Sequence, residues 1–308
     1  MDFTTITKLA RFKTILMTLL KYGFDDLAQR LDLPGSRIIE KPDSNDKILG
    51  TYERIRCVIE DLGPTFIKIG QIMSLRPDLL PQPLIKELSK LQDDVQPVAP
   101  EEIRPVVEAS LGREISEVFS VFAAEPFAAA SISQVHRGIL RNDGTVVSIK
   151  VQRPGIKKRI EADLDILAAI ANRLHERSHD LKIYDLPTLV RVTRRNLLGE
   201  IDFTREARNM KIAASYQRES PWLYIPRVYD QYCSKKVLVM EYIHGTKLKD
   251  IETGAVADAE KMAKNGLRAA IGQILEDGFF HADPRPGNVM VDGESRLCLL
   301  DWGLVGRL

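Results

Sequence analysis

The sequence has no apolar run approaching the roughly 20 residues that a membrane-spanning helix needs, and its N-terminus lacks the pattern of a cleavable signal peptide. It has only three cysteines, which are far apart and form no CxxC pair (Cys57, Cys233 and Cys298). Their spacing argues against a metal site and predicts reduced thiols in a cytoplasmic protein. With 44 basic and 43 acidic residues, the chain also lacks the excess of positive charge that nucleic-acid binding would favour.

The N-terminal segment has an amphipathic pattern that allows two interpretations. Apolar residues fall on one helical stripe (Leu9, Phe12, Leu16, Leu19 and Leu20), with basic residues nearby (Lys8, Arg11, Lys13 and Lys21). Such a helix can lie on a membrane surface, which would place a bacterial-type cytoplasmic protein peripherally on the inner membrane. It can equally pack against its own protein.

The order of the predicted elements indicates an α+β fold in a chain of 308 residues, long enough for two lobes. Residues 1–115 are mostly helical in pattern, and strands appear after them. Helices are expected over 1–33, 45–74, 81–92, 101–111, 156–177, 187–217 and 258–278. Pairs of strands are expected on either side of turns at 142–144, 234–236 and 292–293, and the last strand is expected to extend to Gly303.

Lys150 ends the run "TVVSIK", whose β-branched residues predict a strand. A lysine on such a strand can hold the phosphates of a nucleotide when a helical glutamate pairs with it, as in protein kinases. Two glutamates in "GEIDFTREARN" are candidates for that partner, Glu200 and Glu206. Taken alone, a single lysine on a strand is more often a solvated edge residue, so the argument depends on the motifs further along the chain.

Those motifs are "HADPRPGN" (281–288) and "LLDWG" (299–303). Asp283 and Asn288 have the spacing of the kinase catalytic loop, in which the aspartate orients and deprotonates the attacking group and the asparagine binds Mg²⁺. Asp301 then fits the second magnesium ligand, and Gly303 lets the backbone turn after it. Each piece is weak alone, but their order and spacing together predict a site for a nucleotide and Mg²⁺.

Two features differ from an ordinary protein kinase. The loop over the nucleotide should be rich in glycine, but here it reads "FAAASISQVHRG" (127–138). Its alanines have small side chains, but they make the loop backbone stiffer than glycines would. Ala282 stands where kinases usually have the arginine that receives a phosphorylated activation loop. We therefore expect no regulation of that kind.

Taken together, these motifs resemble those of the UbiB (AarF/ADCK) family of atypical protein-kinase-like proteins. The matching stretches are "FIKIGQIMSLRPDLLP" (66–81), "AAASISQVHRG" (128–138), "SIKVQRPG" (148–155), "EIDFTREARN" (200–209), "HADPRPGN" and "LLDWG". The resemblance implies a protein-kinase-like fold with a helical N-terminal extension carrying a KxGQ motif (1–115). A small β-rich N-lobe with inserted helices (116–243) and part of a helical C-lobe (244–308) would follow.

The resemblance also implies roles for particular residues. Lys68 and Gln71 of the extension would enter the active site, where Lys68 would pair with Glu200, the first residue of a Glu-x-Asp motif that Asp202 completes. Glu206 would pair with Lys150, and helical geometry allows Glu200 and Glu206 to face different lysines from one helix. The nucleotide would contact a larger set of residues (Ala128, Ala129, Ala130, Ser131, Ile132, Val135, Lys150 and the hinge residues Glu241 and Ile243).

Two positions depart from the family pattern. Arg285 stands where members usually have a second histidine, and its permanent charge could either contact phosphate or disturb the loop. Ser148 replaces the usual alanine before the Ile-Lys pair, a change we expect to be tolerated.

The resulting expectation is an ATP-binding, Mg²⁺-dependent atypical kinase or ATPase that supports biosynthesis of ubiquinone or another prenyl-lipid quinone. Its partners would be ATP or ADP, a prenyl-lipid or quinone precursor and quinone-biosynthesis enzymes, with peripheral membrane contact. The main alternative is a non-catalytic, nucleotide-gated module that binds lipid or acts as a scaffold. A small-molecule kinase of the aminoglycoside-phosphotransferase kind is a third, but it has no reason to carry "KIGQ". Because an activation segment should follow Gly303, the C-lobe is expected to be truncated and the chain to be a fragment or short form.

Overall fold

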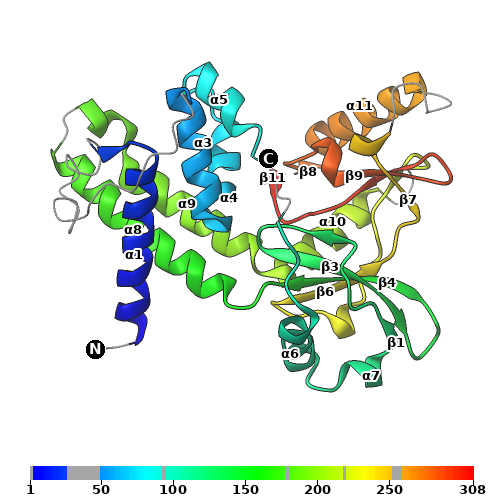
Figure 1. Cartoon of the computed structure of the whole chain (residues 1–308). Coiled ribbons are helices and arrows are strands. Elements are labelled where there is room, and N and C mark those ends of the chain that lie inside the picture. Colours follow the sequence, from blue (N-terminus) through cyan, green and yellow to red (C-terminus); the bar gives the residue numbers. More distant parts are fainter. Residues whose placement is uncertain (1–2, 26–48, 92–94, 178–179, 218–219, 252–258) are drawn as a thin grey trace. The chain divides into compact units, whose positions relative to one another are not determined.

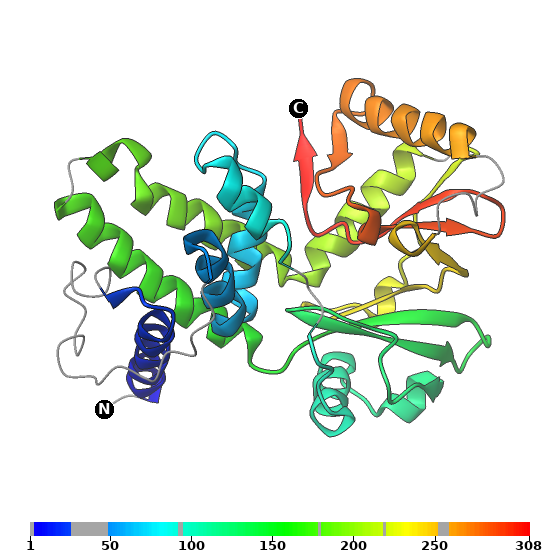
Figure 2. The same ribbon diagram turned by 45° about the horizontal axis from the view of Figure 1, so that its top comes forward.

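The computed structural model describes residues 3–25, 49–91, 95–177, 180–217, 220–251 and 259–308. These residues form two compact units, both traced in Figures 1 and 2. The helical unit comprises residues up to Gln96 together with Ala129–Ile132 and Gly155–Leu198. The sheet unit comprises Pro97–Ala128, Ser133–Pro154 and Gly199–Leu308.

The helical unit is built from α1 (Phe3–Lys21), α3 (Thr51–Leu62), α4 (Pro64–Ser74), α5 (Gln82–Leu88), α8 (Ile156–Arg177) and most of α9 (Leu186–Glu200). The prediction of a single helix over 45–74 is therefore wrong, because the helix is interrupted at Gly63. There φ is +86°, a conformation that side-chain-bearing residues rarely adopt, and Pro64 then begins α4 in a position that suits proline. The helix expected over 1–33 ends at Lys21, and 26–48 lie outside the described residues.

The apolar stripe of α1 packs inside the helical unit. Leu16 and Leu20 of the stripe and the neighbouring Ile15 are buried, in clusters with residues of α3, α4 and α8, whereas Leu9 at the start of the stripe is exposed. The guanidinium of Arg11 binds the buried carboxylate of Asp163 on α8 and the carbonyl oxygen of Leu62 at the end of α3. Of the two interpretations of this segment, the structure therefore supports intramolecular packing for the stripe. No helix among the described residues is both long and apolar enough to cross a membrane.

The first sheet of the sheet unit has the order β1 (Phe119–Phe122), β3 (Ser133–Leu140), β4 (Val146–Gln152) and β6 (Val237–Glu241), and β2 (Ala128–Ala129) also pairs with β3. The β3–β4 hairpin confirms the predicted turn at 142–144, where Gly144 has a φ of +74°. Helices α6 (Pro100–Leu111) and α7 (Ile115–Val118) precede this sheet and share its core.

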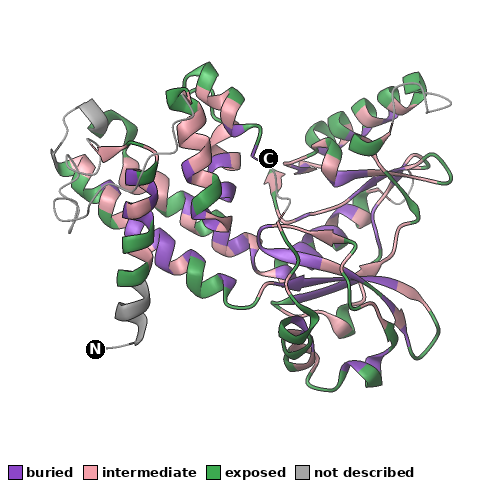
Figure 3. Cartoon of the chain, viewed as in Figure 1, coloured by how far each residue is buried: buried purple, intermediate pink, exposed green. Residues whose placement is uncertain are grey.

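The two faces of β4 have different neighbours, because alternate side chains of a strand point to opposite faces. Val147, Ile149 and Val151 are fully buried in a cluster with Ile103 and Val107 of α6. Burial is continuous along β4 from Val147 to Gln152 (Figure 3). The other face carries Ser148, Lys150 and Gln152, all of them buried as well. A polar face is thus buried along the same strand, and Lys150 lies on it.

The helical pattern over 187–217 forms two helices, α9 and α10 (Phe203–Tyr216), with a break at Ile201–Asp202. Asp202 caps α10 by accepting a hydrogen bond from the backbone N–H of Thr204 at 3.1 Å. Tertiary contacts fix the break, because the Gln152 side chain donates to the carbonyl of Ile201 at 2.7 Å and Phe203 N–H donates to the carbonyl of Lys235 at 3.2 Å. The start of α10 is therefore tied to the end of β4.

A second sheet has the order β5 (Leu223–Tyr224), β10 (Leu297–Leu299), β9 (Val289–Asp292) and β7 (Gly245–Lys247). A two-stranded sheet pairs β8 (Phe279–His281) with β11 (Val305–Arg307), and α11 (Ala259–Leu275) precedes it. The β9–β10 hairpin confirms the predicted turn at 292–293. Its second strand ends at Leu299, however, and does not reach Gly303.

The strand pair expected around 234–236 is wrong in its first member. β5 runs parallel to β10 in the second sheet, and only an isolated bridge joins Val228 to Met240 of β6. Pro226, which cannot donate a ladder hydrogen bond, and a 3₁₀ turn at Asp230–Tyr232 separate the two segments.

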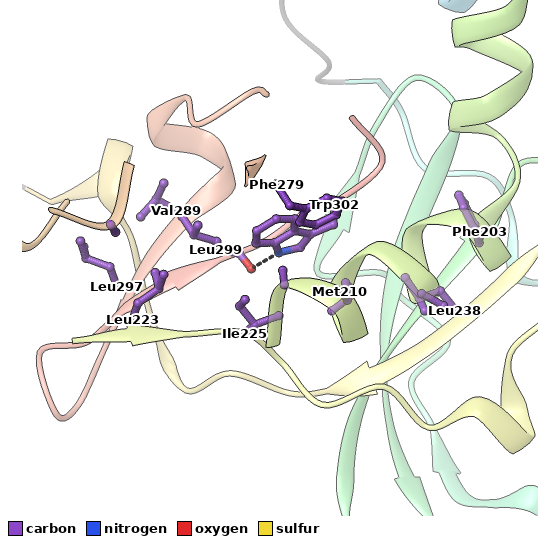
Figure 4. Packing of buried hydrophobic residues seen from close by; sticks show 13 residues of the cluster. Phe203, Met210, Leu223, Ile225, Leu238, Phe279, Val289, Leu297, Leu299 and Trp302 are labelled. Carbon is purple, nitrogen blue, oxygen red and sulfur yellow. Dashed lines mark hydrogen bonds between the residues drawn. The ribbon is translucent and has the colours of Figure 1, made fainter. Parts of the chain in front are cut away.

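The core of the sheet unit joins α10 to the second sheet. Phe203, Met210 and Leu238 are buried in one cluster with Leu297, Leu299 and other residues of that sheet (Figure 4). Trp302 lies in this cluster and has no exposed surface. Leu299 and Trp302, on either side of Asp301, are therefore fixed by packing.

Candidate functional site

Lys150 binds two carboxylates in the interior of the sheet unit. It lies opposite Val135 of β3 and Leu238 of β6, and its side chain is only 8% exposed. Its Nζ donates to both oxygens of Glu206, at 2.8 and 2.9 Å, and to Oδ1 of Asp301 at 3.3 Å. Three residues from a strand, a helix and a loop thus meet at one ammonium group.

The charges of this cluster are strongly coupled. Burial lowers the pKa of Lys150, but the negative charges of Asp301 and Glu206 outweigh burial and hold its pKa above the ordinary value for lysine. Burial raises the pKa of Glu206, although the charge of Lys150 opposes that effect. Lys150 therefore stays cationic at neutral pH. The ring of Phe203 adds a cation–π contact, with Nζ 5.3 Å from its centroid.

The structure assigns the partner of Lys150 to Glu206 rather than Glu200. The expectation that both glutamates belong to one helix is wrong, because Glu200 ends α9 and Glu206 lies in the first turn of α10. Glu200 lies instead beside the "DWG" turn, since its Cγ would be 3.6 Å from a Cβ placed on Gly303.

The KxGQ motif lies on α4 in the helical unit. Lys68 is 8% exposed there, and the side chain of Gln71 donates to the carbonyl of Leu91 at 3.2 Å. Gly70 has the terminal carbon of the Leu91 side chain against it, so a larger residue here would displace that side chain. Lys68 and Glu200 belong to different units, and their pairing stays a prediction.

The catalytic-loop motif folds around Asp283. Nδ2 of Asn288 donates to the carbonyl oxygen of Asp283 at 3.1 Å and to its Oδ2 at 3.0 Å. The backbone N–H of Asp283 donates to Nδ1 of His281 at 3.1 Å, so Nε2 of His281 carries the hydrogen and donates to the carbonyl of Leu300 at 2.8 Å. The backbone N–H of Leu300 donates to the carbonyl of Asn288 at 2.8 Å. The loop and the strand before Asp301 are therefore joined from both sides.

Asp301 adopts a left-handed conformation with φ of +57°, which aspartate tolerates better than most residues. The turn is held on its far side, because Nδ2 of Asn209 donates to the carbonyl of Trp302 at 2.9 Å. Asn209 lies one helical turn after Glu206, so α10 contacts both Lys150 and the turn that carries Asp301.

The donor set fits Mg²⁺. Asn288 turns its NH₂ group toward Asp283, which leaves its amide oxygen on the opposite edge, and Asp301 contributes a carboxylate. Oxygen ligands from one or two side chains, completed by phosphate oxygens and water, are what Mg²⁺ usually takes in nucleotide sites. Among the described residues there is no group of three or more His, Cys, Asp or Glu side chains that would hold a metal without a nucleotide.

The remaining residues predicted to contact the nucleotide are divided between the two units and differ in their burial. Ala128 and Ala129 form β2, and the residues from Ala129 to Ile132 group with the helical unit. Ser131 and Ile132 are buried. In the hinge, the backbone N–H of Glu241 donates to the carbonyl of Arg227 at 2.8 Å, so any adenine contact from Glu241 must use its carbonyl oxygen. Ile243, two residues beyond the end of β6, is partly exposed.

Three contributions were missed at the sequence level. His281 had no assigned role although it begins the loop motif, and Asn209 had none although its spacing from Glu206 places both on one helical face. The third is an ion pair in which Nε of Arg285 lies 3.2 Å from Oδ2 of Asp283. The identity of Arg285 was noticed from the sequence, but its partner could not be predicted.

Comparisons with known proteins agree with this geometry. Residues 90–308 match the model of a family described as the ABC1 atypical kinase-like domain. The chain is 40% identical over 266 residues to a probable protein kinase UbiB of Cellvibrio japonicus, an alignment covering 84% of this chain and 48% of that protein. It is 36% identical to the corresponding protein of Pseudomonas fluorescens Pf-5, covering 100% of this chain and 59% of the relative. It is 39% identical to the chloroplastic protein ACTIVITY OF BC1 COMPLEX KINASE 7 of Arabidopsis thaliana, an alignment covering 84% of this chain and 37% of that protein.

Among solved structures, the complex of Rv3197 with erythromycin from Mycobacterium tuberculosis has a similar fold, with a TM-score of 0.59 and 25% identity over 82% of this chain and 64% of that one. The chain spans about half the length of the curated relatives it matches. The family match covers well over half of the 308 residues, and it includes Lys150, Glu206, Asp283, Asn288 and Asp301. The chain therefore has a protein-kinase-like α+β fold and belongs to the family of ABC1 atypical kinase-like proteins, among which its UbiB relatives fall.

Proposed function

We propose that this protein binds ATP with Mg²⁺ and acts as an atypical kinase or ATPase of the UbiB type. The observation that carries the proposal is the buried contact of Lys150 with both Glu206 and Asp301. An ion pair that only stabilises the fold needs one carboxylate beside the lysine. A kinase-type site needs two, a glutamate that holds the phosphate-binding lysine and an aspartate nearby that binds the metal. The contact pattern of Asn288 and Asp283 supports the same function from the other side of the site.

In the proposed reaction, an oxygen of water or of an acceptor hydroxyl forms a bond to the γ-phosphorus. The bond to the bridging oxygen breaks, ADP leaves, and the proton of the attacking oxygen passes to the Asp283 carboxylate. Lys150 would hold the α- and β-phosphates. Asn288 and Asp301 would hold Mg²⁺, which supplies positive charge to the phosphate oxygens.

The proposed setting is the biosynthesis of ubiquinone or another prenyl-lipid quinone, in the cytoplasm and peripherally at the inner membrane. The similarity to the bacterial UbiB proteins supports this assignment. Prenyl-lipid precursors and quinone-biosynthesis enzymes are the proposed partners. The resemblance implies that the KxGQ segment blocks docking of a protein substrate, so conventional protein phosphorylation is not part of the proposal.

Nucleotide binding can be measured as a thermal shift. ATP or ADP with Mg²⁺ should raise the melting temperature of the purified chain, because a ligand that binds only the folded state stabilises it. At 100 times the dissociation constant the gain should be about 2.7 kcal/mol. Lys150→Ala should abolish the shift, because the phosphates lose their cation. Lys236→Ala, which removes an exposed lysine next to β6, should keep it. A shift that survives in Lys150→Ala would refute the proposed site.

The second candidate is a non-catalytic, nucleotide-gated module that binds lipid or assembles other proteins. The ion pair between Arg285 and Asp283 favours it, because a carboxylate neutralised by arginine is a weaker proton acceptor.

Asp283→Asn separates the two candidates. The variant should keep its affinity for ATP, because the amide retains the size and one acceptor oxygen of the carboxylate. An enzyme should lose hydrolysis or transfer by about 10²-fold or more, the usual contribution of a general base, measured as phosphate release in single turnover. Unchanged phosphate release in a variant that still binds ATP would show that Asp283 is no base. Complementation of a quinone-deficient strain should fail with the variant only if catalysis is required.

A further inference from the structure

Arg285 and Asn288 fix the same oxygen of Asp283. Nε of Arg285 lies 3.2 Å from Oδ2, and Nδ2 of Asn288 donates to that atom at 3.0 Å. The pair is partly open to solvent, with side-chain exposures of 39% for Arg285 and 31% for Asp283. The carboxylate is therefore held by two donors from its own loop, one of them permanently charged.

The charges around this point need such a cation. Three carboxylates belong to the proposed site, those of Glu206, Asp301 and Asp283, and Lys150 is already bound to the first two. The terminal phosphate of ATP would have to approach Asp283, and two negative charges a few ångströms apart repel each other. Arg285 supplies the positive charge on the Asp283 side of the site.

We propose that Arg285 is a positioning residue that acts through Asp283. It holds the carboxylate in line with Asn288 and neutralises it, so that the site accepts the γ-phosphate of a nucleoside triphosphate. The inference rests on the proposed function, and it predicts a difference between the two nucleotides. Arg285 should increase the affinity for ATP but hardly change the affinity for ADP, because the phosphates of ADP would end near Lys150.

The test compares Arg285→Gln and Arg285→Lys with a matched control, Arg296→Gln. Arg296 also pairs with an aspartate of the sheet unit, through Nε to Oδ2 of Asp292 at 2.7 Å, and its side chain is 32% exposed. It lies beside the β9–β10 turn. Each variant of the 308-residue chain is titrated with Mg²⁺–ATP and Mg²⁺–ADP by calorimetry, and ATP hydrolysis is measured as kcat and KM.

Arg285→Gln should weaken ATP binding by about tenfold, the effect of losing one charge-assisted hydrogen bond, and should change ADP binding by less than about twofold. Arg285→Lys should restore the affinity for ATP, because the charge remains, and Arg296→Gln should behave as the unaltered protein. Hydrolysis by Arg285→Gln should show a raised KM and a lowered kcat.

Several results would overturn the inference while leaving the proposed function intact. They are equal losses of ATP and ADP affinity in Arg285→Gln, no loss of either, or a rise in kcat, which would mean that Arg285 restrains the reaction. Failure of the unaltered protein to bind either nucleotide would instead refute the proposed function, and the inference with it.

Discussion

Replacing Trp302 by alanine should lower the free energy of unfolding by about 3–5 kcal/mol, the range for removing a fully buried aromatic side chain. Trp302 has no exposed surface and is central to the core of the sheet unit (Figure 4). Its ring stacks parallel to that of Phe279 at 6.3 Å and meets the ring of His281 edge-on at 4.9 Å. Its indole N–H donates to the carbonyl of Leu299 at 3.1 Å. The substitution removes packing and a hydrogen bond at once.

The effect should extend to the functional site. Trp302 directly follows Asp301, and its carbonyl accepts the hydrogen bond from Asn209. A cavity at this point would loosen the turn that aims Asp301 at Lys150. We therefore expect Trp302→Ala to lose nucleotide affinity as well as stability.

Urea denaturation followed by circular dichroism measures the loss, and the other tryptophan gives a matched control. Trp222 is only partly buried and packs at the edge of the same cluster, so Trp222→Ala should cost clearly less. If Trp302→Ala does not fold, Trp302→Phe keeps most of the packing and removes the hydrogen bond to Leu299, which should cost about 1 kcal/mol plus the lost ring volume. Equal losses in the two tryptophan variants would contradict the assigned core.

The parts of the site that the sequence predicted are those whose partners lie close along the chain. Asp283 and Asn288 meet within one loop, and the hairpins at 142–144 and 292–293 are set by turns of two or three residues. Such contacts depend on local spacing and turn chemistry, which the sequence shows directly.

The parts that could not be predicted depend on distant segments. The choice between Glu200 and Glu206 follows from the break between α9 and α10, which Gln152 on β4 helps to fix through the carbonyl of Ile201. Continuous helical periodicity across 187–217 gave no sign of that contact. In the same way, β5 pairs with β10 far along the chain rather than with the nearby β6, because pairing in sheets is not restricted to neighbours. The local signals for the break were Gly199, which has a low helix propensity, and Asp202, since aspartate followed by a helical run is a common N-cap.

Removing the carboxylate of Glu206 should be the most damaging single change to the site. Glu206 is 2% exposed and binds Lys150 through both oxygens, so Glu206→Ala leaves a buried ammonium beside the single carboxylate of Asp301. Breaking a buried ion pair from one side typically costs 3–5 kcal/mol, roughly, because the remaining charge stays in the interior. The variant should also lose nucleotide binding, since Lys150 would shift toward Asp301 and away from the phosphates.

A double-mutant cycle separates the ion pair from general damage. Glu206→Leu with Lys150→Met removes both charges and fills the space with apolar groups, so it should cost less than the sum of the two single changes, in the way buried pairs behave elsewhere. The control pair is Glu260 and Lys264 on α11, which is exposed and should contribute at most about 0.5 kcal/mol. Additive losses in the Lys150–Glu206 cycle would mean that each residue stabilises the fold through separate contacts. A double variant as stable as the parent that binds no ATP would show that the pair is kept for the phosphates rather than for the fold.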